Sequence, residues 1–128
     1  MRTIFSVAIA TAIVALGSGV AFAQAPAKAG DSAKGKTLVD AKGMTLYTYD
    51  RDTTAGKSSC NGNCATNWPP LMASAGAKAE GAWTVITRDD GGKQWAYKGK
   101  PLYFWKDDKK AGDAEGDGRN NIWHIAAP

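Results

Sequence analysis

Two cysteines and a single histidine carry the most distinctive chemistry in this sequence. Cys60 and Cys64 are the only cysteines and His124 is the only histidine. An even number of cysteines in a chain with an export signal, described below, favours a disulfide, which would close a small ring. Soft thiolates also suit Cu(I), so the same pair with His124, completed by Met44 or Met72, is an alternative copper site. The spacing differs from that of c-type haem attachment and of thioredoxin-like redox pairs.

An acidic loop in the C-terminal part of the chain is a second candidate site. Asp113, Glu115 and Asp117 occupy positions 1, 3 and 5 of a segment with Gly118 at position 6, which is how a Ca²⁺-binding loop begins. Position 12 is His124 instead of a bidentate Glu, and no helical pattern flanks the loop. A solvated acidic loop is therefore the simpler interpretation.

The third candidate is a motif that the chain contains twice. Residues 43–52 return 56 positions later as residues 99–108. The shared positions are Leu46, Tyr47, Tyr49 and Asp52, matched by Leu102, Tyr103, Trp105 and Asp108. A repeat of this kind indicates one supersecondary unit used twice.

This motif has a structural interpretation and a chemical one. A carboxylate just after an aromatic strand can accept backbone N–H groups and close the following loop, and a buried tyrosine can place its hydroxyl on a partner. Two carboxylates could also act as an acid and a base or bind a ligand, but nothing in the sequence brings Asp52 and Asp108 together. We therefore expect the motif to be structural.

The aromatic content suggests a further function without establishing it. The chain has five Trp, four Tyr and three Phe. These side chains could fill the thin core of a small β domain, or form a platform on which sugars stack. The sequence contains no G-x-S-x-G motif, no phosphate-binding glycine loop and no metal-hydrolase histidine pair. We therefore expect no enzymatic activity and no cofactor.

The elements that position these residues are short strands. We expect a hairpin from residues 37–39 and 44–49, strands at 83–87, 94–97 and 101–105, and a closing strand at 122–125. Residues 63–68 could form one turn of helix, and no segment beyond the N-terminal apolar run has sustained helical periodicity. The sequence predicts an all-β domain of about six to eight short antiparallel strands built from two internal repeats, as a small sandwich or an open barrel.

The N-terminal residues predict export. An apolar run at residues 4–20 follows Met1 and Arg2 and ends in Ala21, Phe22 and Ala23, a pattern typical of a cleaved signal peptide. We expect residues 1–23 to be a signal peptide, residues 24–36 a flexible leader, and residues 37–128 a two-repeat β domain with repeats at about 37–72 and 93–126. No cysteine follows the apolar run to accept a lipid. The mature chain is thus expected to be periplasmic or secreted and not to span the membrane.

The charge of the chain excludes one class of partner. The formal net charge is +4, with 16 basic and 12 acidic residues, and the basic residues are scattered singly between acids. Nucleic-acid binding proteins concentrate basic residues in a patch or stripe. We therefore expect no nucleic-acid partner.

The repeated frame of Tyr, any residue, an aromatic residue, two residues and Asp resembles the signature of a bacterial secreted-repeat family, also described as predicted lipoproteins. The run from Cys60 through Trp68 to Leu71 is similar to that family as well, and the resemblance covers residues 35–125. It implies a location in the cell envelope and no particular activity. The missing lipid-accepting cysteine departs from the lipoprotein description.

The expected function is that of a non-enzymatic binding or interaction module of the cell envelope, with an envelope component as its partner. One alternative is a small periplasmic copper-handling or redox-partner protein that uses Cys60, Cys64 and His124. Another is an aromatic-lined binder of envelope glycans. The sequence does not indicate an oligomeric state.

Overall fold

The computed structural model describes residues 25–128, so the expected signal peptide at residues 1–23 lies outside the described residues. Seven strands, one short α-helix and one 3₁₀ helix make up the described chain. They are β1 (Lys28–Ser32), β2 (Gly35–Val39), β3 (Tyr47–Tyr49), α1 (Asn63–Asn67), β4 (Trp83–Thr87), β5 (Lys93–Tyr97), β6 (Lys100–Pro101), η1 (Arg119–Asn121) and β7 (Trp123–Ile125). The expected all-β class is confirmed, and the short helix lies where a helical turn was expected.

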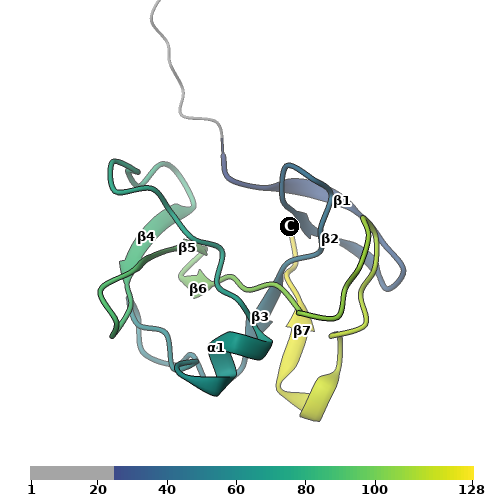
Figure 1. Cartoon of the computed structure of the whole chain (residues 1–128). Helices are drawn as coiled ribbons and strands as arrows, with labels where there is room; N and C mark the ends of the chain where they lie inside the picture. Colours follow the sequence, from purple (N-terminus) through teal and green to yellow (C-terminus); the bar gives the residue numbers. More distant parts are fainter. Residues whose placement is uncertain (1–24) are drawn as a thin grey trace, which may run out of the picture.

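The strands form three small antiparallel sheets. β1 pairs with β2, β3 with β7, and β4, β5 and β6 form a three-stranded sheet. Figure 1 shows two lobes, with β1, β2, β3 and β7 in one and β4, β5, β6 and α1 in the other. The sheets do not close on one another, so the arrangement is closer to a sandwich than to a barrel.

Each lobe is completed by a segment from the other half of the sequence. In the lobe of the first half (residues 25–72), Leu46 N–H donates to Leu38 O at 3.0 Å. Ala126, near the C-terminus, donates to Leu46 O and accepts from Leu38 N–H, both at 2.9 Å. The last segment of the chain therefore bonds to two segments of the first half that are also bonded to each other.

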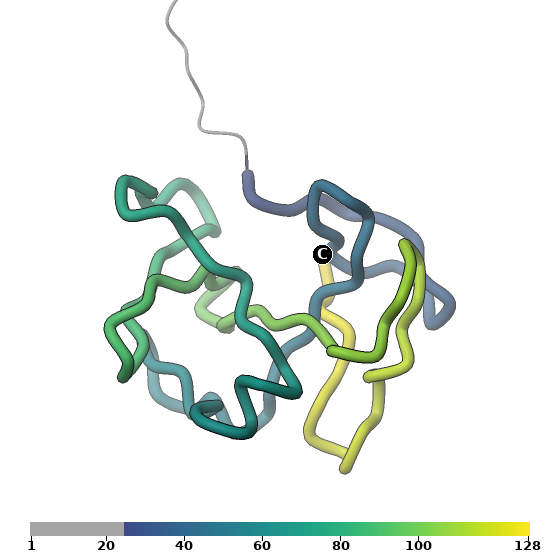
Figure 2. Tube along the Cα trace, in the orientation of Figure 1, coloured from purple at the N-terminus to yellow at the C-terminus, as the bar shows by residue number. Residues whose placement is uncertain are grey.

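The second half (residues 83–128) shows the same arrangement with the roles exchanged. Leu102 N–H donates to Trp95 O at 3.1 Å, while Leu71 donates to Leu102 O and accepts from Trp95 N–H, both at 2.9 Å. At the centre Tyr47 and Tyr103 exchange backbone hydrogen bonds of 2.8 and 3.0 Å. Figure 2 lets the reader follow residues 68–72 and 123–128 as each runs into the opposite lobe. The two halves are thus intertwined.

The expectation of a flexible leader at residues 24–36 is wrong for most of that segment. β1 lies within it and pairs along its whole length with β2, from Lys28 opposite Val39 to Ser32 opposite Gly35. Few apolar side chains are needed to order this segment, because the hairpin satisfies the hydrogen-bonding groups of the backbone. Ala27, of which 7% is exposed, adds a buried apolar side chain. Gly30 also permits close packing, since a Cβ there would lie 2.7 Å from a methyl group of Val39. The ordered first repeat therefore begins before residue 37.

Two expected strands are shorter than predicted because the chain changes partners along them. Thr45 forms a bridge with Val39, whereas β3 pairs with β7. In the second half β6 ends at Pro101, and Tyr103 bridges both Tyr47 and Pro70. Each motif segment thus runs from its own lobe into the contact with the other half.

Two buried clusters fill the interior. One is aliphatic, with half-buried aromatic side chains packed against it, and the other is aromatic and contains the disulfide. The first consists of Ala27, Leu38, Leu46, Leu71, Leu102 and Ala126. The second consists of Tyr47, Cys60, Trp68, Tyr103, Trp105 and Trp123.

Candidate functional site

The repeated tyrosine and aspartate pair across the two halves. The Tyr47 hydroxyl donates to Asp108 Oδ2 at 2.5 Å, and the Tyr103 hydroxyl donates to Asp52 Oδ2 at 2.6 Å. Each tyrosine therefore bonds to the aspartate of the other repeat. Both tyrosine side chains are fully buried, so they do not line a cleft.

The second oxygen of each aspartate closes the loop that follows it. Asp52 Oδ1 accepts the backbone N–H of Ser59 at 2.6 Å, and Asp108 Oδ1 accepts that of Glu115 at 3.0 Å. Each carboxylate thus ties its own loop to the tyrosine of the other half. The arrangement stabilises loops and does not bring the two carboxylates into one reacting site.

Burial changes the acidity of these groups. Desolvation first, and then the hydrogen bond to the partner carboxylate, raise the pKa of the Tyr47 and Tyr103 phenols above their ordinary value of 10.0. Burial also raises the pKa of Asp52, against the opposing effect of the hydrogen bonds from Tyr103 and Ser59 and of the positive charge of Arg88. The two phenols are therefore held protonated in the folded protein.

The structure places the two cysteines in a disulfide and does not assemble the copper set. The Sγ atoms of Cys60 and Cys64 are 2.05 Å apart. His124 lies on β7, where its Nε2 is 2.8 Å from Asp50 Oδ2. Within residues 25–128 no three His, Cys, Asp or Glu side chains converge in a way that could hold a metal ion. The alternative copper site therefore lacks its thiolates.

The acidic loop also lacks a convergent set of ligands. Asp113 Oδ2 accepts the backbone N–H groups of Lys109 and Lys110 at 2.9 and 3.2 Å. Asp117 Oδ1 accepts the N–H of Ile125 at 2.9 Å. Glu115 lies at the surface. These acids hold turns and the start of the last segment in place, and they do not form a Ca²⁺ site.

The sequence interpretation missed a buried arginine. Arg88, only 3% exposed, donates from Nη1 to Ser58 Oγ at 3.0 Å and to Gln94 Oε1 at 2.7 Å, and from Nη2 to Cys60 O at 2.5 Å. Ser58 Oγ is also 2.6 Å from the Tyr103 hydroxyl. Arg88 therefore fastens the disulfide loop to β5. The alternation of β4 puts Arg88 on the same face as the buried Ile86, which is the signal that could have identified it.

A pocket of about 280 Å³ lies where the last segment of the chain meets β5 and β6. We call it the His124 pocket. Its lining combines polar groups with an apolar wall and consists of Thr48, Asp50, Tyr97, Lys98, Lys100, Leu102 and residues 124–128. A smaller pocket of about 120 Å³ shares Thr48, Asp50 and Lys100 and extends to Asp52.

The His124 pocket arises because the two repeats differ there. The last segment carries Ala126 and Ala127 at the positions where residues 71 and 72 are Leu and Met. The smaller side chains fill less of the space beside Leu102. The contact between Asp50 and His124 also has no counterpart, since the matching positions in the other half are Lys106 and Pro69. Several residues that line the pocket therefore differ from their counterparts in the other half.

The pocket contains charged groups of both signs. Asp50 is the only acidic side chain in its lining, and it is paired with His124. Lys98 and Lys100 line the same space, and neither lies within ion-pair distance of a carboxylate in the part of the chain that the structure describes. The Lys98 ammonium lies 5.1 Å from the centre of the Tyr97 ring. The pocket thus offers two cations and one aromatic ring.

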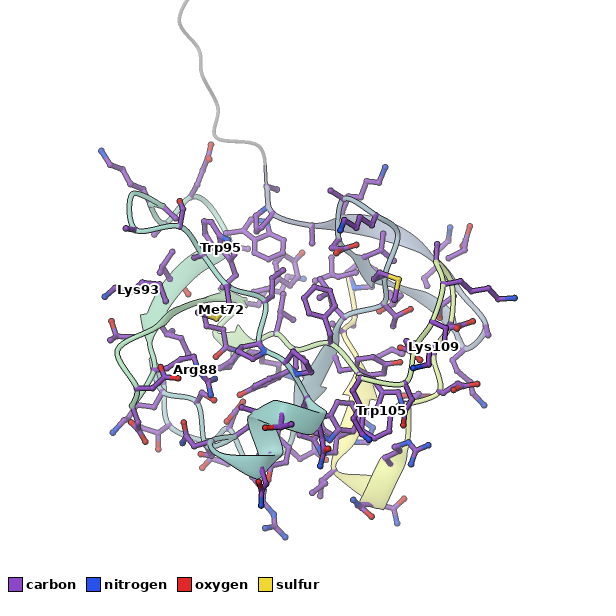
Figure 3. All side chains as sticks on the ribbon, in the orientation of Figure 1. Met72, Arg88, Lys93, Trp95, Trp105 and Lys109 are labelled. Carbon is purple, nitrogen blue, oxygen red and sulfur yellow. A yellow bond between two sulfur atoms is a disulfide. The ribbon has the colours of Figure 1, made fainter. Side chains whose placement is uncertain are left out.

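Half of the aromatic side chains in residues 25–128 are buried and not available to a ligand. Tyr47, Trp68, Tyr103, Trp105 and Trp123 are buried, and Figure 3 shows Trp105 among the side chains between the halves. Half-buried aromatic side chains pack against the aliphatic cluster at Trp83, Trp95, Tyr97 and Phe104. Of these, Tyr97 alone lines the His124 pocket. Trp83, Trp95 and Tyr97 lie next to one another, with ring centroids 6.2 Å apart for Trp83 and Trp95 and 4.7 Å apart for Trp83 and Tyr97.

Comparison with known proteins identifies the repeats. The model of a family described as "Secreted repeat of unknown function" matches residues 28–72 and 84–127. Both matched segments begin with the first strand of a lobe, β1 or β4, and so include the strand that the sequence interpretation omitted from each repeat. Searches of curated proteins and of solved structures found no match. Among residues 25–128, no helix is long and apolar enough to cross a membrane.

Proposed function

The chain belongs to this family of secreted repeats, and from that membership we propose that it is an exported, non-enzymatic binding module of the cell envelope whose ligand site is the His124 pocket. The observation that supports the proposal is the difference between the repeats at the pocket. The motif residues build the same contacts twice, whereas the pocket is lined by residues that differ between the halves, such as Asp50, His124 and Ala127. Ligand sites are commonly concave, apolar in part and equipped with a few polar groups.

A binding role fits the groups in the pocket better than catalysis does. The acidic residues of the repeats are engaged with tyrosine hydroxyls and backbone N–H groups. In the pocket, Asp50 and His124 contact each other at the surface. The exposed fraction of the side chain is 45% for His124 and 52% for Asp50. No hydroxyl or thiol nucleophile lies in hydrogen-bond contact with His124 within the described residues.

Export through the signal peptide at residues 1–23, with release into the periplasm or the medium, is part of the proposal. The disulfide supports it, because disulfides form and persist in oxidising compartments.

A pocket-filling variant tests the binding role. Ala127→Met copies Met72, the residue at the matching position of the other half, and adds a side chain at an exposed pocket position without disturbing the core. Ala55→Met, in an exposed loop outside the pocket lining, is the matched control. We expect small envelope-derived compounds that raise the melting temperature of the natural protein to lose this effect with Ala127→Met and keep it with Ala55→Met. Equal stabilisation of both variants would place the ligand elsewhere.

A further inference from the structure

We propose that two copies of this chain form a swapped dimer, in which the first half of each copy folds with the second half of the other. The first half ends at Met72, the second begins at Trp83, and residues 73–82 are the linker between them. The proposal names a partner and does not depend on the ligand of the His124 pocket. It is drawn from the contacts between the halves, the isolation of the linker and the distance that the linker spans.

The halves hold each other through contacts that do not require a continuous chain. Ala126 of the second half makes backbone hydrogen bonds of 2.9 Å with Leu38 and Leu46 of the first. Tyr47 and Tyr103 bond to each other across the centre at 2.8 and 3.0 Å. Both buried clusters also contain side chains of both halves. A second half from another copy can therefore supply the same groups in the same places.

Each half needs its complement. Leu46 and Leu102 are both 0% exposed, and each belongs to a cluster that the opposite half helps to build. Removal of this apolar surface from water drives association of the halves. The disulfide of Cys60 and Cys64 lies within the first half, so the linker is the only covalent connection between the halves. The surface that each half offers thus fits the other half of this same sequence.

The linker lies apart from the rest of the molecule. Backbone hydrogen bonds fasten it to the described chain only at Ala73 and at residues 80–82. Between these points one such bond forms within the linker, from Ala77 N–H to Ser74 O at 3.0 Å. A Cβ on Gly76 would meet nothing within 4 Å, and Figure 2 shows the linker as a loop at the edge of its lobe. The linker can therefore open without loss of a contact between the halves.

The linker is longer than the distance that it spans. Ala73 bonds to Lys93 at the start of β5, and Trp83 lies opposite Tyr97 at its end. Four residues along β5 and two strand spacings across it give a separation of about 16 Å. The ten steps from Ala73 to Trp83 can reach about 33 Å.

The concentration at which the dimer forms follows from this slack. The monomer and the swapped dimer contain the same contacts between halves, so the linker decides between them. A short flexible linker gives the halves of one chain an effective concentration of about millimolar. We therefore expect the monomer to prevail at micromolar concentration and the swapped dimer to form as the chain approaches the millimolar range. Such exchange between copies is a low-cost route to dimers.

Two deletions in residues 24–128 test the role of the linker. Deletion of residues 74–81 leaves two steps between Ala73 and Trp83, which reach about 7 Å at most, so the halves of one chain cannot meet. We expect this variant to be a dimer by light scattering at about 10 µM. Deletion of residues 75–78 is the matched control, because its six steps still reach about 20 Å, and it should be a monomer. A folded monomer with residues 74–81 deleted would overturn the proposal.

Complementation between two damaged chains tests the swap without shortening the linker. Leu46→Asp and Leu102→Asp each place a carboxylate in the buried aliphatic cluster and should unfold the chain that carries them. In an equimolar mixture, the intact second half of one variant can fold with the intact first half of the other. Near-ultraviolet circular dichroism should then recover half of the natural signal, because two chains contain one intact domain instead of two.

The outcomes decide the proposal even if the shortened chain does not fold. A mixture of Leu46→Asp and Leu102→Asp that stays as unfolded as each variant alone would overturn it. So would the natural chain if it remained entirely monomeric after refolding at about 1 mM, the effective concentration that the linker provides. In the swapped dimer each His124 pocket is lined by Thr48 and Asp50 of one copy and by residues 124–128 of the other. Dimer formation would therefore preserve the pocket.

Discussion

The crossed pairing of the repeated tyrosines and aspartates makes a quantitative prediction about which residues are coupled. Tyr47 bonds to Asp108 at 2.5 Å and makes no hydrogen bond to Asp52, the aspartate of its own repeat. Tyr47→Phe removes the hydroxyl that donates to Asp108 and that also accepts the N–H of Gly116 at 3.2 Å. The carboxylate left behind is 8% exposed, so water can replace the lost donor only in part.

The magnitude follows from the type of bond. A hydrogen bond to a charged group contributes about 1.5–3 kcal/mol, and we expect Tyr47→Phe to lower the free energy of unfolding by about that amount. This is a large share of the roughly 5–15 kcal/mol that stabilises a typical small domain. In a double-mutant cycle, Tyr47→Phe and Asp108→Ala should show a coupling energy of about 1.5–3 kcal/mol. The cycle of Tyr47→Phe with Asp52→Ala should show less than about 0.5 kcal/mol, because these side chains do not share a hydrogen bond.

Urea denaturation followed by tryptophan fluorescence measures these energies, provided that the slope with denaturant is the same for all variants. The aromatic cluster contains Trp68, Trp105 and Trp123, so unfolding should change the emission strongly. The mirror cycle of Tyr103→Phe with Asp52→Ala provides an internal control. A larger coupling between Tyr47 and Asp52 than between Tyr47 and Asp108 would refute the crossed arrangement.

Three further predictions concern the scaffold. Because burial raises the pKa of both motif phenols above 10.0, the stability that they contribute is fully present below pH 10 and is lost as the pH rises through the raised values. We expect the free energy of unfolding to fall by about 2.7 kcal/mol per pH unit above pH 10, because unfolding would release two protons. A free energy of unfolding from urea denaturation that does not change with pH in this range would contradict the prediction. Arg88→Met leaves Cys60 O and Gln94 Oε1 without their donor and should lower the free energy of unfolding by about 2–4 kcal/mol in the same assay, whereas the exposed Lys93→Met should have almost no effect. Finally, fragments 25–78 and 79–128 should each be unfolded alone by circular dichroism and fold when mixed, because each lobe needs a segment of the other half; a folded single fragment would contradict the exchange.

The local structure of this chain was predictable where neighbouring residues determine it. β4 was predicted with the bounds that the structure shows, β5 begins one residue before the expected start, and α1 lies within the expected turn. Each of these elements forms with partners that are close in sequence. The repeat of Tyr47 and Asp52 at Tyr103 and Asp108 also pointed correctly to a two-part domain.

The contacts between distant segments were not predictable from the same signals. The pairing of β3 with β7 joins Tyr47 to Ile125, and alternation of side chains identifies a strand without naming its partner. β1 was missed because its residues are small and polar, although the backbone ladder with β2 and the packing of Gly30 on Val39 are what hold it. The pocket was missed for a related reason. It depends on the contact of Ala126 with Leu46 and Leu38, which only the exchange of segments creates.

The exchange also explains where this fold can vary. A change in Tyr47 or Asp108 weakens a bond that spans both halves, so the motif positions are constrained in both repeats at once. Some positions that line the His124 pocket carry less constraint, because Asp50, Lys98 and Ala127 are exposed and take no part in the crossed tyrosine and aspartate bonds. Substitutions there can change the lining of the pocket without weakening the crossed tyrosine and aspartate bonds. A scaffold of this kind keeps much of its stability in the repeated residues and leaves exposed, unrepeated residues, such as those of the proposed ligand site, free to vary.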